Sequence, residues 1–165
     1  MKKKRYKFSL LFLVILFGSV FISCHKDRNY PIEPVITFKD YIKYGNDSAD
    51  FMINFTDGDG DIGLDKADTF PPYDTSSIYY NNIFLHYQYK DSLGYHDFNV
   101  SGSPLEYNYR IPVITPFGSD KSLNGEIHVR LFAPVGAHPV FRFRCFIVDR
   151  ALHESNKIDS PDLTP

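Results

Sequence analysis

The sequence predicts an all-β fold, a single antiparallel β-sandwich, and three observations favour it. Apolar and polar residues alternate in one segment after another from residue 35 onward. Beyond the first 24 residues, no window of about eleven residues shows helical spacing with capping residues. The chain has 165 residues, which is enough for one domain with a real core and too few to expect two.

The alternating segments predict strands over residues 35–40, 51–56, 83–90, 95–100, 107–114, 126–131 and 141–148, and a short strand near 156–159. Residues 91–94 suit a hairpin turn, and Pro112 should interrupt the strand that contains it. The proline-containing residues 70–73 are too irregular to assign, and the alternation over 35–40 does not settle which face is buried.

Four of these segments have a clear apolar face. The inward-facing sets are Phe51, Ile53 and Phe55; Ile83, Leu85, Tyr87 and Tyr89; Ile127, Val129 and Leu131; and Phe141, Phe143, Cys145 and Ile147. Seven or so strands at this spacing, with 16% aromatic residues and no Trp, predict one immunoglobulin-like sandwich over residues 35–165. Cys145 should then be a buried, inert thiol and not a nucleophile.

The N-terminus carries the pattern of a secreted, lipidated protein. A basic cluster over residues 2–7 precedes the apolar run Phe8 to Ile22, which is shorter than the ~20 residues needed to span a bilayer. The run ends in Phe21-Ile22-Ser23-Cys24, which resembles the lipobox of bacterial lipoproteins. The alternative is an ordinary N-terminal membrane anchor with an incidental cysteine.

The lipobox resemblance implies a signal peptide over residues 1–23 and acyl chains such as palmitate on Cys24. Residues 24–34 would form a polar tether. Each buried methylene contributes about 0.8 kcal/mol, so two or three chains would hold the protein on a membrane. We expect the outer membrane, with the periplasmic and cell-surface faces both open.

The charge of the chain limits its possible partners, and its cysteine content limits its possible disulfides. Without the five basic residues of the leader, 13 basic residues face 20 acidic ones, a formal charge of −7. This balance argues against nucleic acid as a partner. Once Cys24 carries lipid, Cys145 is the one remaining thiol, so no disulfide framework is expected.

The densest group of chemistry-bearing residues is the stretch 57–68, DGDGDIGLDKAD. Its carboxylates are Asp57, Asp59, Asp61, Asp65 and Asp68. Calcium prefers six to eight oxygen ligands, but an EF-hand is rejected because Ile62 occupies the position of its glycine and a strand precedes the loop. A calcium-binding loop of a β-sandwich stays open, with Asp149 from a neighbouring loop as a sixth candidate ligand.

The alternative is a tight Asp-Gly turn made soluble by charge, with Asp149 bonding to it from a neighbouring loop. On either interpretation the carboxylates repel one another unless a cation or hydrogen-bond donors lie nearby.

Enzyme activity is not expected. The sequence has no G-x-S-x-G, H-E-x-x-H, C-x-x-C or phosphate-loop motif. Four scattered histidines should be solvated: His86, His96, His128 and His138. Glu106, Glu126 and Glu154 could pair with an Asp for glycoside hydrolysis, but nothing in the sequence places them at a working separation.

Among the many tyrosines, Tyr79 and Tyr80 are the pair most exposed by pattern and the candidate ligand-binding residues, as a stacking surface for a sugar. Packing within the sheets is the alternative for the tyrosines on strands.

Several segments together are similar to a family of Bacteroidetes lipoproteins to which no activity is assigned. They are Phe55 to Gly63, which contains TDGDGDIG, Asn108 to Val113, Asn124 to Ile127, and Asp149 to Asn156. The resemblance implies an immunoglobulin-like domain on a lipid anchor, acting as a binding or structural module for an unknown protein or glycan. The alternative is a carbohydrate-binding accessory lipoprotein in polysaccharide uptake.

Overall fold

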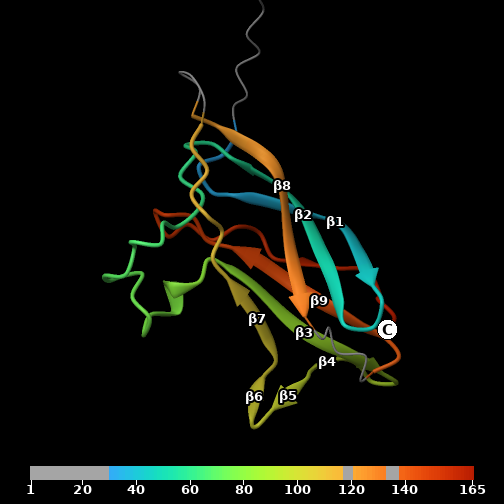
Figure 1. The fold of residues 1–165 in the computed structure, drawn as a ribbon. Coiled ribbons are helices and arrows are strands. Elements are labelled where there is room, and N and C mark those ends of the chain that lie inside the picture. Colours follow the sequence, from blue (N-terminus) through green and yellow to red (C-terminus); the bar gives the residue numbers. More distant parts are fainter. Residues whose placement is uncertain (1–29, 117–120, 133–137) are drawn as a thin grey trace, which may run out of the picture.

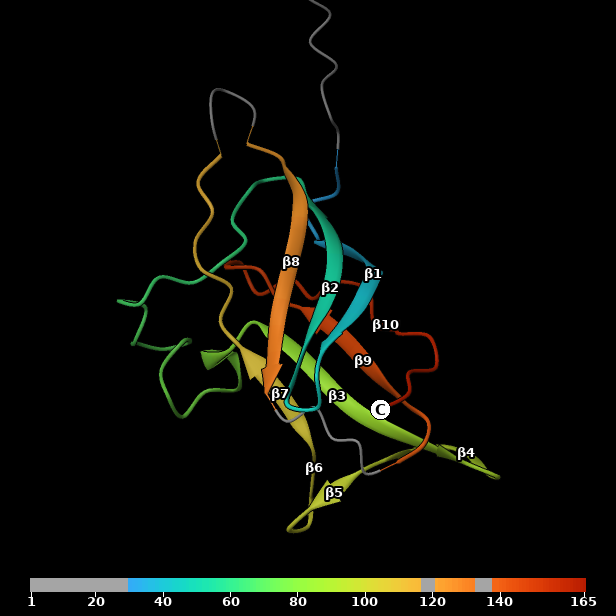
Figure 2. The same ribbon diagram turned by 45° about the vertical axis from the view of Figure 1, so that its right-hand side comes forward.

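The computed structural model describes residues 30–116, 121–132 and 138–165. Ten strands in these ranges form two packed antiparallel sheets and a small two-stranded ribbon (Figures 1 and 2). The predicted signal peptide and Cys24 lie outside the described residues. Within the described ranges, no helix has the length and hydropathy needed to cross a membrane.

The first sheet has the order β1-β2-β8. Its strands are β1 (Val35–Tyr44), β2 (Ser48–Asp57) and β8 (Leu123–Phe132). β2 pairs with β8 without a register shift over its whole length, whereas the pairing of β1 with β2 is interrupted between Phe38 and Asp40.

The second sheet is built around β3 (Ile83–Asp91). On one side β3 pairs with β9 (Phe141–Ile147), and β9 pairs in turn with β10 (Ile158–Asp159). On the other side β3 pairs with β4 (Gly94–Asp97) and β7 (Glu106–Tyr109). The ribbon consists of β5 (Asn99–Val100) and β6 (Ser103–Pro104).

The two sheets divide the strands as an immunoglobulin-like domain does. The orders β1-β2-β8 and β10-β9-β3-β4 correspond to strands A-B-E and G-F-C of that fold, with one further strand beside C. The prediction of an all-β, antiparallel β-sandwich is therefore confirmed.

The core lies between the sheets and contains the side chains that the alternation placed inward. Phe51 of β2 packs edge-on against Phe143 of β9, with ring centroids 5.6 Å apart, and Tyr87 stacks on Phe141 at 5.2 Å. Cys145 is fully buried among them, and burial raises its pKa to about 12. The prediction that this thiol is buried is confirmed, and its lack of reactivity stays a prediction.

Several boundaries differ from those predicted, because strands end where their partners end. β2 extends to Asp57, so this residue belongs to the strand and not to the following loop. β7 ends at Tyr109, which pairs with Ile83 at the first residue of β3, and no further residue of β3 is there to continue the pairing toward Pro112. The one helical element among the described residues is a 3-10 turn, Ile78–Tyr80, capped by Ser77.

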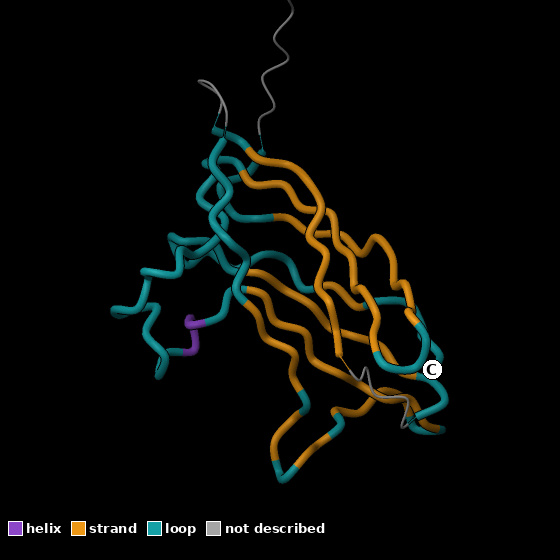
Figure 3. The backbone as a smooth tube through the Cα atoms, in the orientation of Figure 1, coloured by secondary structure: helices purple, strands orange, loops and turns teal. Residues whose placement is uncertain are grey.

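The longer connections gather at the end of the sandwich where β2 finishes and the N-terminal chain enters (Figure 3). They include residues 58–82 between β2 and β3, and residues 148–157 between β9 and β10. Residues 30–34, which we expected to belong to a free tether, contact this end of the domain: Pro34 is buried, and the backbone of Tyr30 and Pro31 lies against Gly58.

Candidate metal centre

Three of the six predicted metal ligands come together where β2 ends. Asp57, Asp59 and Asp61 each offer a carboxylate oxygen, and these oxygens lie within 4.8 Å of one another. Calcium holds its oxygen ligands at about 2.3–2.6 Å, so two ligands of one ion are separated by at most about 5 Å. The spacing of the cluster is therefore compatible with three ligands of a single ion.

Asp57 is the least ordinary residue of this cluster. Its side chain is 0% exposed, and neither carboxylate oxygen has a hydrogen-bond partner of normal geometry among the described residues. Burial raises the pKa of Asp57 to about 6, and the charges of Asp59, Asp61 and Asp149 contribute to the rise. The nearby backbone N–H of Asp61 offsets only part of this effect.

A buried carboxylate without partners costs several kcal/mol when it is ionised, unless an opposite charge compensates it. Asp61 likewise has a buried carboxylate oxygen and a raised pKa, but only Oδ1 of its two oxygens is buried without a partner among the described residues. Its pKa is raised first by burial and then by Asp149 and Asp59. The backbone N–H of Ala151 and the charge of His153 act in the opposite direction.

Asp149 reaches the cluster from the other sheet, just after β9. It is 1% exposed, and its charge is close enough to raise the pKa of both Asp57 and Asp61. Its oxygens are held within its own turn: the backbone N–H of His153 donates to Oδ1 at 2.8 Å, and Nδ1 of His153 lies 2.9 Å from Oδ2. The bond to Asp149 raises the pKa of His153. The expected approach of Asp149 to the acidic loop is therefore seen, although it bonds to His153 and not to that loop.

Asp65 and Asp68 do not join the cluster. Asp65 Oδ1 accepts a hydrogen bond from the Ala67 backbone N–H at 2.8 Å, which fixes a local turn. Asp68 accepts from the Asp65 N–H at 2.7 Å and forms a two-pronged ion pair with Arg150, at 2.6 and 2.7 Å. Arg150 lowers the pKa of Asp68. These two carboxylates are therefore satisfied without a metal and shape the loop instead.

The glycines between the aspartates allow close packing as well as turns. A Cβ on Gly58 would collide with the backbone carbonyls of Tyr30 and Pro31, although the φ angle of Gly58 is not positive. A Cβ on Gly60, where φ is +73°, would collide with the backbone of Lys121. The sequence alone suggests a role for these glycines in turn formation only. The acidic loop in fact packs tightly between two other segments of the same pole.

The special position of Asp57 and the role of His153 were both missed from the sequence. The signal for Asp57 was present, because the inward series Phe51, Ile53 and Phe55 continues to Asp57 when the alternation is extended by two residues. His153 offered only its spacing of four residues from Asp149, which does not reveal that the two side chains would meet.

The tyrosines considered for stacking are not fully exposed in the described part of the chain. Tyr87 is buried in the core, and Tyr79 and Tyr80 on the 3-10 turn are each half-buried. The guanidinium of Arg110 lies 4.9 Å from the centre of the Tyr80 ring. The stacking of a sugar on Tyr79 and Tyr80 stays a prediction.

The histidines and glutamates are distributed over several elements. His86 lies 3.4 Å from Glu106, His96 3.0 Å from Asp91 and His128 3.2 Å from Glu126. His128 is exposed, as predicted, whereas His86, His96 and His138 are each half-buried, and His138 stacks on Tyr89 at 4.3 Å. Glu154 is 3.6 Å from Lys157.

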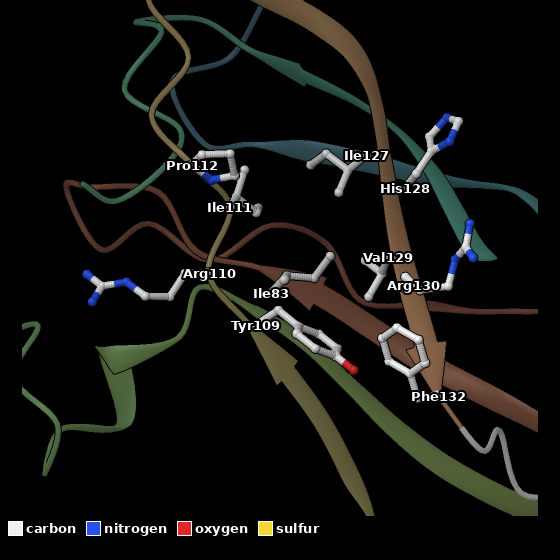
Figure 4. Close-up of a pocket in the computed structure, with 10 residues that line it drawn as sticks. All are labelled: Ile83, Tyr109, Arg110, Ile111, Pro112, Ile127, His128, Val129, Arg130 and Phe132. Carbon is white, nitrogen blue, oxygen red and sulfur yellow. The ribbon is translucent and has the colours of Figure 1, made fainter. Parts of the chain in front are cut away.

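An apolar pocket of about 340 Å³ lies between β8 and the end of β7 (Figure 4). Ile83, Tyr109 and Ile111 line one side, and Ile127, Val129 and Phe132 line the other. Figure 4 shows the side chains of Arg110, His128 and Arg130 directed away from it. The pocket shares no residue with the acidic cluster and has no carboxylate in its lining.

Comparison of the chain with protein-family models, with curated proteins and with solved structures found no match.

Proposed function

We propose that this chain is a membrane-anchored lipoprotein that presents its immunoglobulin-like domain as a binding or structural module, stabilised by calcium bound at Asp57, Asp59 and Asp61. The observation that carries the calcium site is the carboxylate of Asp57, which is fully buried, has no hydrogen-bond partner among the described residues and faces two further carboxylates. A cation supplies the compensation that this group lacks.

The chemistry of the donors supports calcium over the other common ions. All three ligands are carboxylates, the hard oxygen donors that calcium and magnesium prefer, while zinc sites are built mainly from His and Cys. The neighbouring His153 is bonded to Asp149 through Nδ1. Calcium accepts irregular geometry more readily than magnesium, and a short glycine-rich loop after a strand supplies irregular geometry.

An ion at this position would be bound from the first sheet and would attract a carboxylate of the second. Asp57 ends β2 in the first sheet, and Asp149, whose charge acts on the same cluster, follows β9 in the second. Any ion that binds only the folded chain stabilises it, by about 2.7 kcal/mol when its concentration is 100 times Kd. Extracellular calcium modules commonly have Kd values on the order of 10⁻⁴ to 10⁻³ M.

The calcium site is tested on residues 25–165, which contain every described strand and the whole core. Calorimetric titration should show binding, and about 5 mM calcium should raise Tm relative to EDTA. The Asp59→Ala, Asp61→Ala double variant should lose both signals. Asp65→Ala, which removes an acidic side chain of the same loop outside the cluster, should keep them. No heat and no shift in Tm for the wild-type domain would refute the site.

The lipid anchor is tested separately on the full chain in a bacterial host that lipidates proteins. Labelled palmitate should be incorporated into the wild-type chain, and Cys24→Ser should abolish the label and release the protein from the membrane fraction. A wild-type chain that is unlabelled and soluble would contradict the anchor while leaving the calcium site standing.

A further inference from the structure

The connection between β2 and β3, residues 58–82, begins at the acidic cluster and is long for a compact domain. Within it, we call residues 62–80 the projecting loop. Long connections with little regular structure are usually functional in compact domains. The side chains of Phe70 and Ile78 on the projecting loop are 77% and 75% exposed, so an apolar surface is held out into solvent there.

A single residue fastens this loop to the domain at three points. The backbone N–H of Arg150 donates to the carbonyl of Asp61 at 3.3 Å. Its guanidinium forms the two-pronged pair with Asp68, and its carbonyl accepts a hydrogen bond from the hydroxyl of Tyr73. Arg150 therefore contacts the start, the middle and the outer part of the connection.

A second set of contacts holds the loop from the side of β7. Nη2 of Arg110 donates to the carbonyl of Asp68 at 3.0 Å, and the same guanidinium lies over the Tyr80 ring. The backbone N–H of Leu64 donates to the carbonyl of Ile111 at 2.8 Å. These contacts do not involve the acidic cluster, so they provide an anchor that should persist whether or not an ion is bound.

The contacts of Arg150, in contrast, are built from the residues of the cluster itself. Asp61 offers its carboxylate to the cluster and its carbonyl to Arg150, and Asp149 is the residue immediately before Arg150. Four acidic residues act on one another here: Asp57, Asp59, Asp61 and Asp149. Their repulsion tends to separate the loop that follows β2 from the turn that carries Arg150.

We propose that an ion bound at Asp57, Asp59 and Asp61 controls the order of the projecting loop, because it removes the repulsion that opposes the three contacts of Arg150. This inference rests on the calcium site proposed above. With the ion bound, Arg150 holds Asp61, Asp68 and Tyr73 together and fixes Phe70 and Ile78 in space. Without it, the loop keeps only the contacts of the β7 side. Coupling of this kind is reciprocal, so loss of the Arg150 contacts should also weaken the binding of the ion.

The experiment is hydrogen exchange, followed by mass spectrometry, on the full chain in mild detergent with calcium or with EDTA. Calcium should slow exchange over residues 65–80 at least about fivefold, because it stabilises the closed arrangement by about 1 kcal/mol or more. Exchange in the β3–β4 turn, residues 91–94, should not change. Arg150→Gln should still bind calcium at a saturating concentration, as measured by heat release, but should lose the protection of the loop.

Arg144→Gln is the matched control. Arg144 forms an ion pair of the same two-pronged form with Asp159, at 2.7 and 3.1 Å, on the strands β9 and β10. This variant should keep both calcium binding and loop protection.

The possible results separate the two proposals. If calcium binds but hydrogen exchange over residues 65–80 does not change, the ion does not control the order of the loop, and the calcium site itself still stands. Protection that survives in Arg150→Gln overturns the role of Arg150. Absence of calcium binding in the wild-type chain removes the site and this inference together.

Discussion

Asp57 is a charged residue at a buried, inward-facing position of β2, which is unfavourable for an ionised carboxylate. The inward series of β2 runs through Phe51, Ile53 and Phe55 and then continues to a carboxylate, which is 0% exposed. The backbone pairing of β2 with β8 extends to Asp57, opposite Leu123, so the residue cannot turn outward without breaking the strand. The pairing of β2 with β8 therefore keeps this carboxylate buried, which is why a bound cation is proposed to compensate its charge.

The unfavourable position of Asp57 predicts that Asp57→Asn stabilises the domain when no ion is available. The amide removes a buried charge and the repulsion of three neighbouring carboxylates, so Tm in EDTA should rise by about 3 °C or more, which is about 1 kcal/mol for a domain of this size. In about 5 mM calcium the variant should instead have a lower Tm than the wild-type domain, because it lacks one ligand of the ion. Thermal melts in both buffers measure the two differences.

Asp65→Asn is the matched control for this variant. Asp65 is exposed and outside the cluster, so its substitution should change Tm by less than about 1 °C in EDTA and leave the calcium response unaltered. A lower Tm for Asp57→Asn in EDTA would show that the carboxylate is stabilising without an ion.

At the scale of elements, the outer edge of β1 is joined to the second sheet by one side chain. The backbone N–H of Ile36 donates to Oδ1 of Asn156 at 2.8 Å, and Nδ2 of Asn156 donates to the carbonyl of Ile36 at 2.9 Å. The amide thus takes the place of a neighbouring strand and satisfies both backbone groups of Ile36. It also fixes the chain that leads into β10.

Asn156→Ala should lower the free energy of unfolding by about 1–3 kcal/mol, because it leaves the backbone groups of the buried Ile36 without partners. Asn54→Ala is the control. Its amide lies 3.5 Å from the Thr37 hydroxyl on an exposed face, so the change should be below about 0.5 kcal/mol. Urea unfolding curves compare the two, and equal effects would contradict the bridging role of Asn156.

The elements that could be predicted are those with a clean apolar face. β8 and β9 each bury one face and leave the other exposed or half-exposed. β2 and β3 bury their apolar face too, although Asp50, Met52 and Gln88 on the opposite faces are also buried. Alternation therefore identifies these four strands and orients them correctly. β4 and β7 could not be bounded, because their ends depend on how much of β3 remains to pair with them. The contacts that order residues 58–82 could not be seen either, since Arg110 and Arg150 lie far away in the sequence.

At the scale of the whole molecule, Cys145 reports on global unfolding. Its thiol is 0% exposed in the centre of the core, and burial raises its pKa to about 12, so at pH 8 it is both inaccessible and protonated in the folded state. In residues 25–165 it is the one cysteine. A thiol reagent should therefore leave the native domain unmodified for hours at pH 8.

The modification rate in urea should rise along the same curve as the tyrosine fluorescence signal of unfolding. Ser92→Cys, in the exposed turn between β3 and β4, should add one thiol that reacts at once. Rapid modification of Cys145 in native buffer would mean that the core opens locally without global unfolding.

The sandwich and its core can be predicted from the alternation of apolar residues and the chain length. The acidic cluster can be predicted only in part. The spacing of Asp57, Asp59 and Asp61 predicts that they lie near one another, because they are close in the sequence. Their meeting with Asp149 depends on two sheets packing so that the ends of β2 and β9 coincide. Asp65 and Asp68 match the same sequence pattern, and only the position of Arg150 removes Asp68 from the site.

The backbone of Tyr30 and Pro31 lies against Gly58, so the chain leaves the domain beside the acidic cluster. Residues 24–29 can span at most about 20 Å when fully extended. Where Cys24 carries lipid, the cluster is therefore held within a short distance of the bilayer. A surface potential of about −30 mV concentrates a divalent cation about tenfold relative to bulk solution. A site too weak to fill in free solution could thus be filled at an anionic lipid surface, and occupancy would then depend on attachment as well as on affinity.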